Sequence, residues 1–227
     1  MVIHKENTSK NEDINWSGFA FGLQMRLFSD YVSLKLLSHI EPMVSIPTRF
    51  VVMVEVVEKS LKLYLAMHEK LDNALSHYSV VYGHNIEKLR VQAEKFNTVF
   101  ADEDVKQFAR PFNDIHGAFY QKLRYGSQKS IKGFSTNLSQ VMPIVEKIFY
   151  TCILHHEEIG KESINNSSLL FNMITCNQLD QSYNRELVLE AVRKNNPYYS
   201  EYVDYCNTLD QKYKKLMVQF EASKRIN

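Results

Sequence analysis

The chain contains few of the residues that break or staple a fold. Seven glycines and five prolines are few for 227 residues, and chains that turn often, such as β-sandwiches and barrels, usually need more. The three cysteines, Cys152, Cys176 and Cys206, are widely spaced and form no CxxC pair, so neither a disulfide framework nor a zinc knuckle is predicted. The scarcity of breakers favours an all-α protein built from long helices.

Strong net charge and long apolar runs are also missing. The formal net charge is +1, which gives no overall attraction to nucleic acid or to an anionic membrane. The most apolar stretch, Phe50 to Val57, is interrupted by Glu55 and is too short to span a bilayer. Residues 1–14 are polar and lack the apolar core of a secretion signal, so they are expected to form a disordered leader. These features predict a cytoplasmic protein without a membrane partner.

The apolar residues that are present recur at helical spacing in the first part of the chain. This periodicity predicts one helix from Trp16 to about Ile40 and a second from Pro47 to about Leu71. Glu55, Lys59 and Lys62 lie off the apolar stripe of the second helix. We expect these three side chains to face water, with the first two spaced for an i,i+4 ion pair.

A third helix is predicted to follow Gly83. Asn85 is a natural N-cap for it, and His84 beside it is expected to hydrogen bond the exposed backbone at the helix start. The apolar face of this helix is predicted to contain Ile86, Leu89, Ala93, Phe96 and Phe100. The acidic run at 102–104 suits the positive end of a further helix, which Pro111 is expected to interrupt.

The stretch that follows Gly126 is rich in breakers and predicts a boundary. We expect a helical bundle over residues 15–126, a linker over 127–138 and a C-terminal region over 139–227 that packs on the bundle or extends it. Within that region the predicted helices cover about residues 139–158, 163–178, 184–194 and 197–223.

The last of these helices has the clearest start. Asn196 can cap it and Pro197 can occupy its first turn. Its apolar residues alternate four and three positions apart: Tyr202, Cys206, Leu209, Tyr213, Leu216 and Phe220. Such a heptad-like seam fits packing on this chain's own core or pairing with a second copy.

Three short motifs lie between residues 50 and 126, at Val57–Leu65, Gly83–Leu89 and Leu123–Gly126, and together they resemble the HEPN family of helical domains. The run Val57–Leu65 is similar to the helix of that family in which a glutamate, here Glu58, precedes a Leu-Lys pair. Gly83–Leu89 resembles the Gly-His-(Asp/Asn)-Leu-x-x-Leu opening of the family's next helix. Leu123–Gly126 is similar to the Arg-Tyr-Pro ending of many members, although Gly126 stands where proline is usual. The motifs occur in the family's order.

The resemblance implies an antiparallel helical bundle with additional C-terminal helices. Members with the Arg-Tyr-Pro ending are commonly non-catalytic binding or accessory modules. The first hypothesis is therefore a homodimeric protein that binds a nucleotide, RNA or an antitoxin-like partner. The residues marked for ligand binding are His84, Lys122, Arg124 and Tyr125. By its spacing and orientation, the Glu58–Lys62 pair is expected to support the helix.

Many members of the family are instead metal-independent ribonucleases with an arginine, four to six residues and a histidine. Arg110 and His116 have that spacing. Such chemistry needs a histidine that moves a proton and a guanidinium that stabilises charge on the phosphate. Against it, Pro111 stands where a polar residue is usual and breaks the helix. An endoribonuclease using this pair is therefore the alternative to a non-catalytic protein.

Two further clusters of residues are candidates for binding a phosphate backbone or a metal ion. Residues 105–132 carry six lysines and arginines against Asp114 alone, a patch that suits a phosphate backbone or a merely solvated loop. His155-His156-Glu157-Glu158 lacks the i,i+3 or i,i+4 spacing of a helical metal site. No metal or cofactor is predicted. A purely structural helical interaction protein that uses the C-terminal seam is the third reading.

Overall fold

The computed structural model describes residues 16–39, 46–69, 83–112, 138–154 and 185–201, with residues 203, 204, 207, 208 and 211. Its helices are α1 (Trp16–His39), α2 (Ile46–Glu69), α4 (Ile86–Ala93), η1 (Thr98–Ala101), α5 (Glu103–Ala109), η2 (Arg110–Phe112), α7 (Leu138–Leu154) and α9 (Arg185–Arg193). This described part is 87% helical and has no strand, which confirms the predicted all-α fold.

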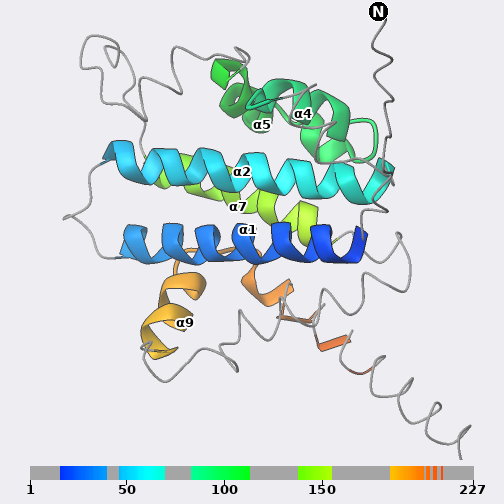
Figure 1. Ribbon diagram of the computed structural model, residues 1–227. Helices are drawn as coiled ribbons and strands as arrows, with labels where there is room; N and C mark the ends of the chain where they lie inside the picture. The colour runs from blue at the N-terminus through cyan, green and yellow to red at the C-terminus, as the bar shows by residue number, and fades with distance from the viewer. Residues whose placement is uncertain are drawn as a thin grey trace, which may run out of the picture.

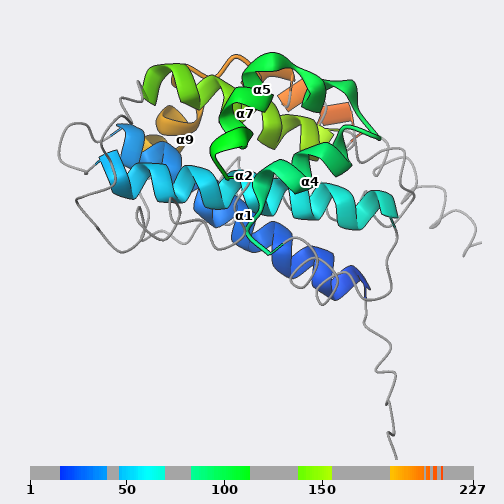
Figure 2. The same cartoon turned by 90° about the horizontal axis from the view of Figure 1, so that it is seen from above.

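Three long helices form the centre of the bundle. In Figure 1, α1 and α2 lie side by side and run in opposite directions, with α7 behind them. Figure 2 shows α4 and α5 along the edge formed by α2 and α7, and α9 at another part of the bundle, next to α1. Helix α2 therefore packs against several other helices, whereas α9 lies at the periphery of the bundle.

The apolar stripe of α2 explains its central place. Its buried residues include Val57, Leu61 and Tyr64, each 1% exposed or less. Burial of one such side chain contributes roughly 1.5–3 kcal/mol. On α7, the Phe149 ring stacks on Tyr31 of α1 with ring centroids 3.9 Å apart. This ring contact shows that α1 and α7 share one core.

Two predictions about side chains at the edges of α2 and α4 are wrong. Glu55 and Lys59 form the expected i,i+4 pair, at 3.3 Å, but they do not face open water: both are about a quarter exposed, and the Lys59 ammonium also contacts Asp30 of α1. Phe96 does not belong to a buried face, since α4 ends at Ala93 and the Phe96 side chain is 43% exposed. Its ring stacks against His68 of α2, with centroids 4.8 Å apart.

Capping residues read from the sequence are confirmed. The Asn85 side chain accepts the Lys88 backbone N–H at 2.9 Å at the start of α4. The Asn196 side chain accepts the Tyr198 backbone N–H at 3.1 Å after α9. Asn195, which lies between α9 and Asn196, has a φ of 54°. Asparagine tolerates this left-handed conformation, which turns the chain back toward the bundle.

Several predictions fall outside the described residues. These are the leader, most of the linker over 127–138, the helix over 163–178 and all six residues of the C-terminal seam. The helix predicted over 184–194 is present as α9, and α7 covers most of the one predicted over 139–158. Among the helices that the structure describes, none combines the length and apolarity that crossing a membrane requires.

Candidate functional site

A carboxylate on α2 and a histidine before α4, both in motifs that carry the resemblance, form a polar cluster. His84 Nδ1 lies 2.9 Å from Glu58 Oε2 and 3.1 Å from Oε1, although the two residues are 26 positions apart. Lys62, one turn along α2, donates to Glu58 Oε1 at 2.6 Å. The expected i,i+4 pair of Glu58 and Lys62 is therefore present, and His84 contacts the same carboxylate.

The local chain conformation explains how His84 reaches Glu58. Gly83 has a φ of 51°, which a residue without a Cβ adopts at little cost, and it turns the chain just before the helix. Asn85 then caps α4 from a fully buried position. Ile86 and Leu89 anchor the first turns of α4 in the core. With the backbone held on both sides, the His84 side chain remains at the surface, 54% exposed.

The electrostatics favour an ionised carboxylate at this site. Burial alone would raise the pKa of Glu58, but the hydrogen bond with His84 and the positive charge of Lys62 outweigh it and hold the pKa below its ordinary value. An ionised carboxylate at Nδ1 fixes the orientation of the imidazole and favours a proton on that nitrogen. When its second ring nitrogen, Nε2, also carries a proton, His84 presents an oriented, positively charged ring to an anion.

The ribonuclease pair is only half within the described residues. Arg110 lies on η2, directly after α5, and its side chain is 60% exposed and 3.5 Å from Glu103. The helix does end before Pro111, as expected. His116, Lys122, Arg124 and Tyr125 lie outside the described residues. Whether Arg110 and His116 converge therefore stays a prediction.

Sequence reasoning missed a second polar cluster, inside the bundle. Lys35 of α1 donates to Glu146 of α7 at 2.5 Å, and both side chains are almost fully buried. The hydroxyls of Tyr31 and Tyr150 lie 3.1 Å apart beside this pair. Glu146 interrupts the apolar run Val141–Ile153, and a charged residue within such a run was the available signal.

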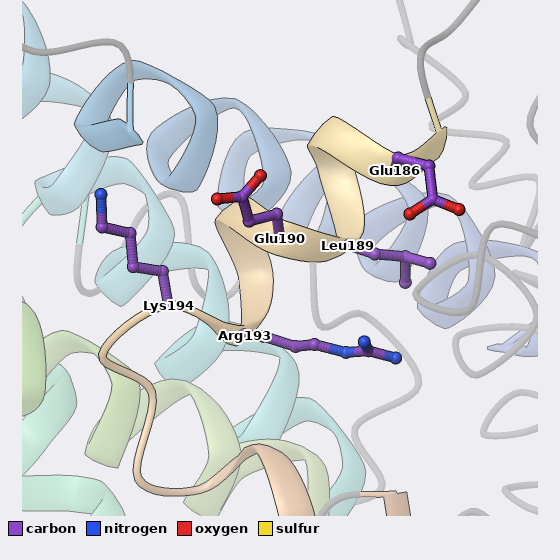
Figure 3. Close-up of a pocket in the computed structure, with 5 residues that line it drawn as sticks. All are labelled: Glu186, Leu189, Glu190, Arg193 and Lys194. Carbon is purple, nitrogen blue, oxygen red and sulfur yellow. The ribbon is translucent and has the colours of Figure 1, made fainter.

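The surface of α9 lines a hollow of about 470 Å³. The described residues around it are Glu186, Leu189, Glu190, Arg193 and Lys194, and Figure 3 shows the first four along α9 and Lys194 directly after its end. The two acidic and two basic side chains balance in charge. Arg193 is also engaged with Tyr199, whose hydroxyl it contacts at 3.2 Å. This hollow therefore has no bias toward a ligand of one sign.

In the described part of the chain, no three histidine, cysteine, aspartate or glutamate side chains are grouped so that they could hold a metal ion. Comparisons with family models, curated proteins and solved structures find no match to this chain.

Proposed function

We propose that this protein is a non-catalytic, HEPN-like binding or accessory protein, and that its ligand carries phosphate, as a nucleotide or RNA does. The observation that supports this most is the contact of 2.9 Å between Glu58 and His84. It joins two of the motifs on which the resemblance depends. An imidazole that is oriented by a carboxylate and more than half exposed can donate a charge-assisted hydrogen bond to a phosphate oxygen.

Nearby cations add to this surface. Lys62 shares the Glu58 carboxylate with His84, and Lys88 is exposed on the first turns of α4. We propose that Lys122, Arg124 and Tyr125 complete the ligand-binding surface. Phosphate contacts of this kind give affinity that falls as salt rises.

The direct test incubates the purified protein with fluorescent single-stranded RNA in EDTA and measures anisotropy and chain length together. We expect binding that weakens with salt and leaves the RNA intact. His84→Ala should weaken binding by about tenfold, which corresponds to one charge-assisted hydrogen bond of about 1.4 kcal/mol. Lys95→Ala, which removes an exposed cation two residues after the end of α4 that is paired with Gln92, is the matched control and should bind as the parent protein does.

Other results would replace the proposal. Cleavage that disappears in His116→Ala would establish a ribonuclease that uses Arg110 and His116. Absence of binding to RNA and to nucleotides at high protein concentration would leave a protein partner as the ligand.

We further propose that the protein is a homodimer that pairs through the apolar seam of its last helix. The seam residues Leu209 and Leu216 suit this test because an aspartate at each would place charge in the interface. A double substitution to Asp should halve the mass measured by light scattering and leave the helical circular dichroism unchanged. A parent protein that is already monomeric would contradict the dimer, and loss of helicity would assign the seam to the chain's own core.

A further inference from the structure

The buried polar cluster lies where α9 and the turn after it meet the bundle. Lys35 Nζ donates to Glu146 and also to the backbone carbonyl of Lys194, at 3.0 Å, one residue beyond the end of α9. The Asn196 side chain contacts the hydroxyls of Tyr150 at 2.9 Å and Tyr31 at 3.2 Å. Polar groups of α1 and α7 thus hold the end of α9.

Apolar packing holds α9 less firmly than it holds α2. The buried apolar side chains of α9 are Val188, Ala191 and Val192, whereas α2 buries eleven apolar side chains from Phe50 to Met67. Elements with few buried apolar contacts open at lower free energy than the core. Local opening of α9, with α2 still folded, is the low-energy motion that this packing predicts.

Opening of α9 would bring water to a carboxylate that the closed bundle buries. Glu146 is fully buried, and its Oε2 has no hydrogen-bond partner of normal geometry among the described residues. The groups that face it are Lys35 and Tyr31 of α1, Tyr150 of α7 and Tyr198 after α9. Lys35 is the one cation in this set, so the ionised form has a single counter-ion.

Burial raises the pKa of Glu146, although Lys35 and Tyr31 act in the opposite direction. In an opened form, where water reaches the carboxyl, this pKa falls toward its ordinary value. A proton is therefore bound more tightly when α9 is closed, and linkage requires that protonation favours the closed form.

We propose that Lys35, Glu146 and the Tyr31–Tyr150 pair form a proton-dependent latch for α9, which closes when Glu146 binds a proton and opens more readily when Glu146 ionises. Opening releases at most one proton to solvent. The opening constant of α9 therefore rises by up to tenfold for each unit of pH between the pKa of Glu146 in the opened form and its higher pKa in the closed form. This proposal is independent of ligand binding at His84.

The test is native-state hydrogen exchange of the full chain between pH 5 and 8, read by mass spectrometry and corrected for the intrinsic exchange rate. Peptides from 185–201 should open more as pH rises, while those from 46–69 keep the protection of the global fold. Glu146→Gln, which cannot ionise, should abolish the pH dependence of α9. Glu190→Gln is the matched control: Glu190 lies on α9, is 69% exposed and is 4.0 Å from His39, and its loss should leave the dependence intact.

Two results would overturn the latch. One is a pH dependence of α9 that persists in Glu146→Gln or disappears in Glu190→Gln. The other is exchange of α9 and α2 with one common opening constant. If Glu146→Gln does not fold, Asn196→Ala serves instead: it removes the tie to the tyrosine pair and should raise α9 opening at every pH while the slope with pH remains.

Discussion

Glu58 and Glu146 both lie within long helices, and both bind a lysine, yet their surroundings differ. Glu58 has two partners, Lys62 and a half-exposed His84, which together hold its pKa low. Glu146 is fully buried, and burial prevails over the opposing effects of Lys35 and Tyr31 and raises its pKa. The balance between polar partners and desolvation therefore decides whether a carboxylate in this bundle has a lowered or a raised pKa.

Removal of the buried cation should have the largest effect. Lys35→Met leaves Glu146 in the core without its counter-ion, and at pH 8 we expect the free energy of unfolding to fall by about 3–5 kcal/mol. Urea denaturation measures it. At pH 5 the loss should be smaller because the carboxyl can take a proton. The double variant Lys35→Met, Glu146→Leu should recover most of the loss; a single substitution that costs under about 1 kcal/mol would contradict the assignment of Lys35 as the counter-ion.

The tyrosine pair should contribute less. Tyr150→Phe keeps the ring but removes the hydroxyl that contacts Tyr31 and Asn196, and we expect a loss of about 1–2 kcal/mol. Tyr199→Phe is the control, because its hydroxyl contacts the exposed Arg193. Equal urea midpoints for the two variants would show that the buried hydroxyl contributes no more than the exposed one.

The surface cluster should contribute least to stability. His84 is 54% exposed, so water and salt screen its ion pair with Glu58, and His84→Ala should cost less than about 1 kcal/mol in a urea titration. The same substitution should weaken RNA binding. A loss of stability as large as that of Lys35→Met would remove the distinction between the two clusters.

The two carboxylates should also impose opposite pH dependences. Glu58 has a lowered pKa, so its contribution to stability is present above the ordinary glutamate pKa and is lost as pH falls through the folded-state value. Glu146 has a raised pKa, so its ionisation costs stability as pH rises toward neutrality. Urea midpoints from pH 3 to 8 should show a flatter acid arm in Glu58→Gln and a flatter decline toward neutral pH in Glu146→Gln. Identical profiles in both variants would contradict the assignment.

Local chemistry explains why much of the fold could be predicted. The spacing of apolar residues is sufficient for α1, α2 and α9, and a side-chain oxygen before a helix is sufficient for the caps at Asn85 and Asn196. Phe96 was misplaced because the periodicity continues past Ala93, where the backbone turns and a 3-10 helix begins at Thr98. Periodicity does not report where a helix stops.

The candidate site could be predicted only in part. The resemblance marked Glu58 and His84 separately, but their contact spans 26 positions and depends on how α4 packs on α2. The Lys35–Glu146 pair spans 111 positions. Contacts between residues so far apart in the chain depend on tertiary packing, which cannot be read from the local spacing of residues in a single sequence.

The most direct test of the proposed function follows the His84 imidazole itself. Protein labelled with ¹⁵N at its histidines is titrated with single-stranded RNA at pH 7, and the His84 resonances are assigned by their loss in His84→Ala. If His84 binds the RNA, these ring resonances should shift and saturate with the same dissociation constant as the anisotropy titration, and the RNA should stay intact. Ring resonances that stay unchanged while RNA binds would contradict it, because the ligand would then lie elsewhere on the protein.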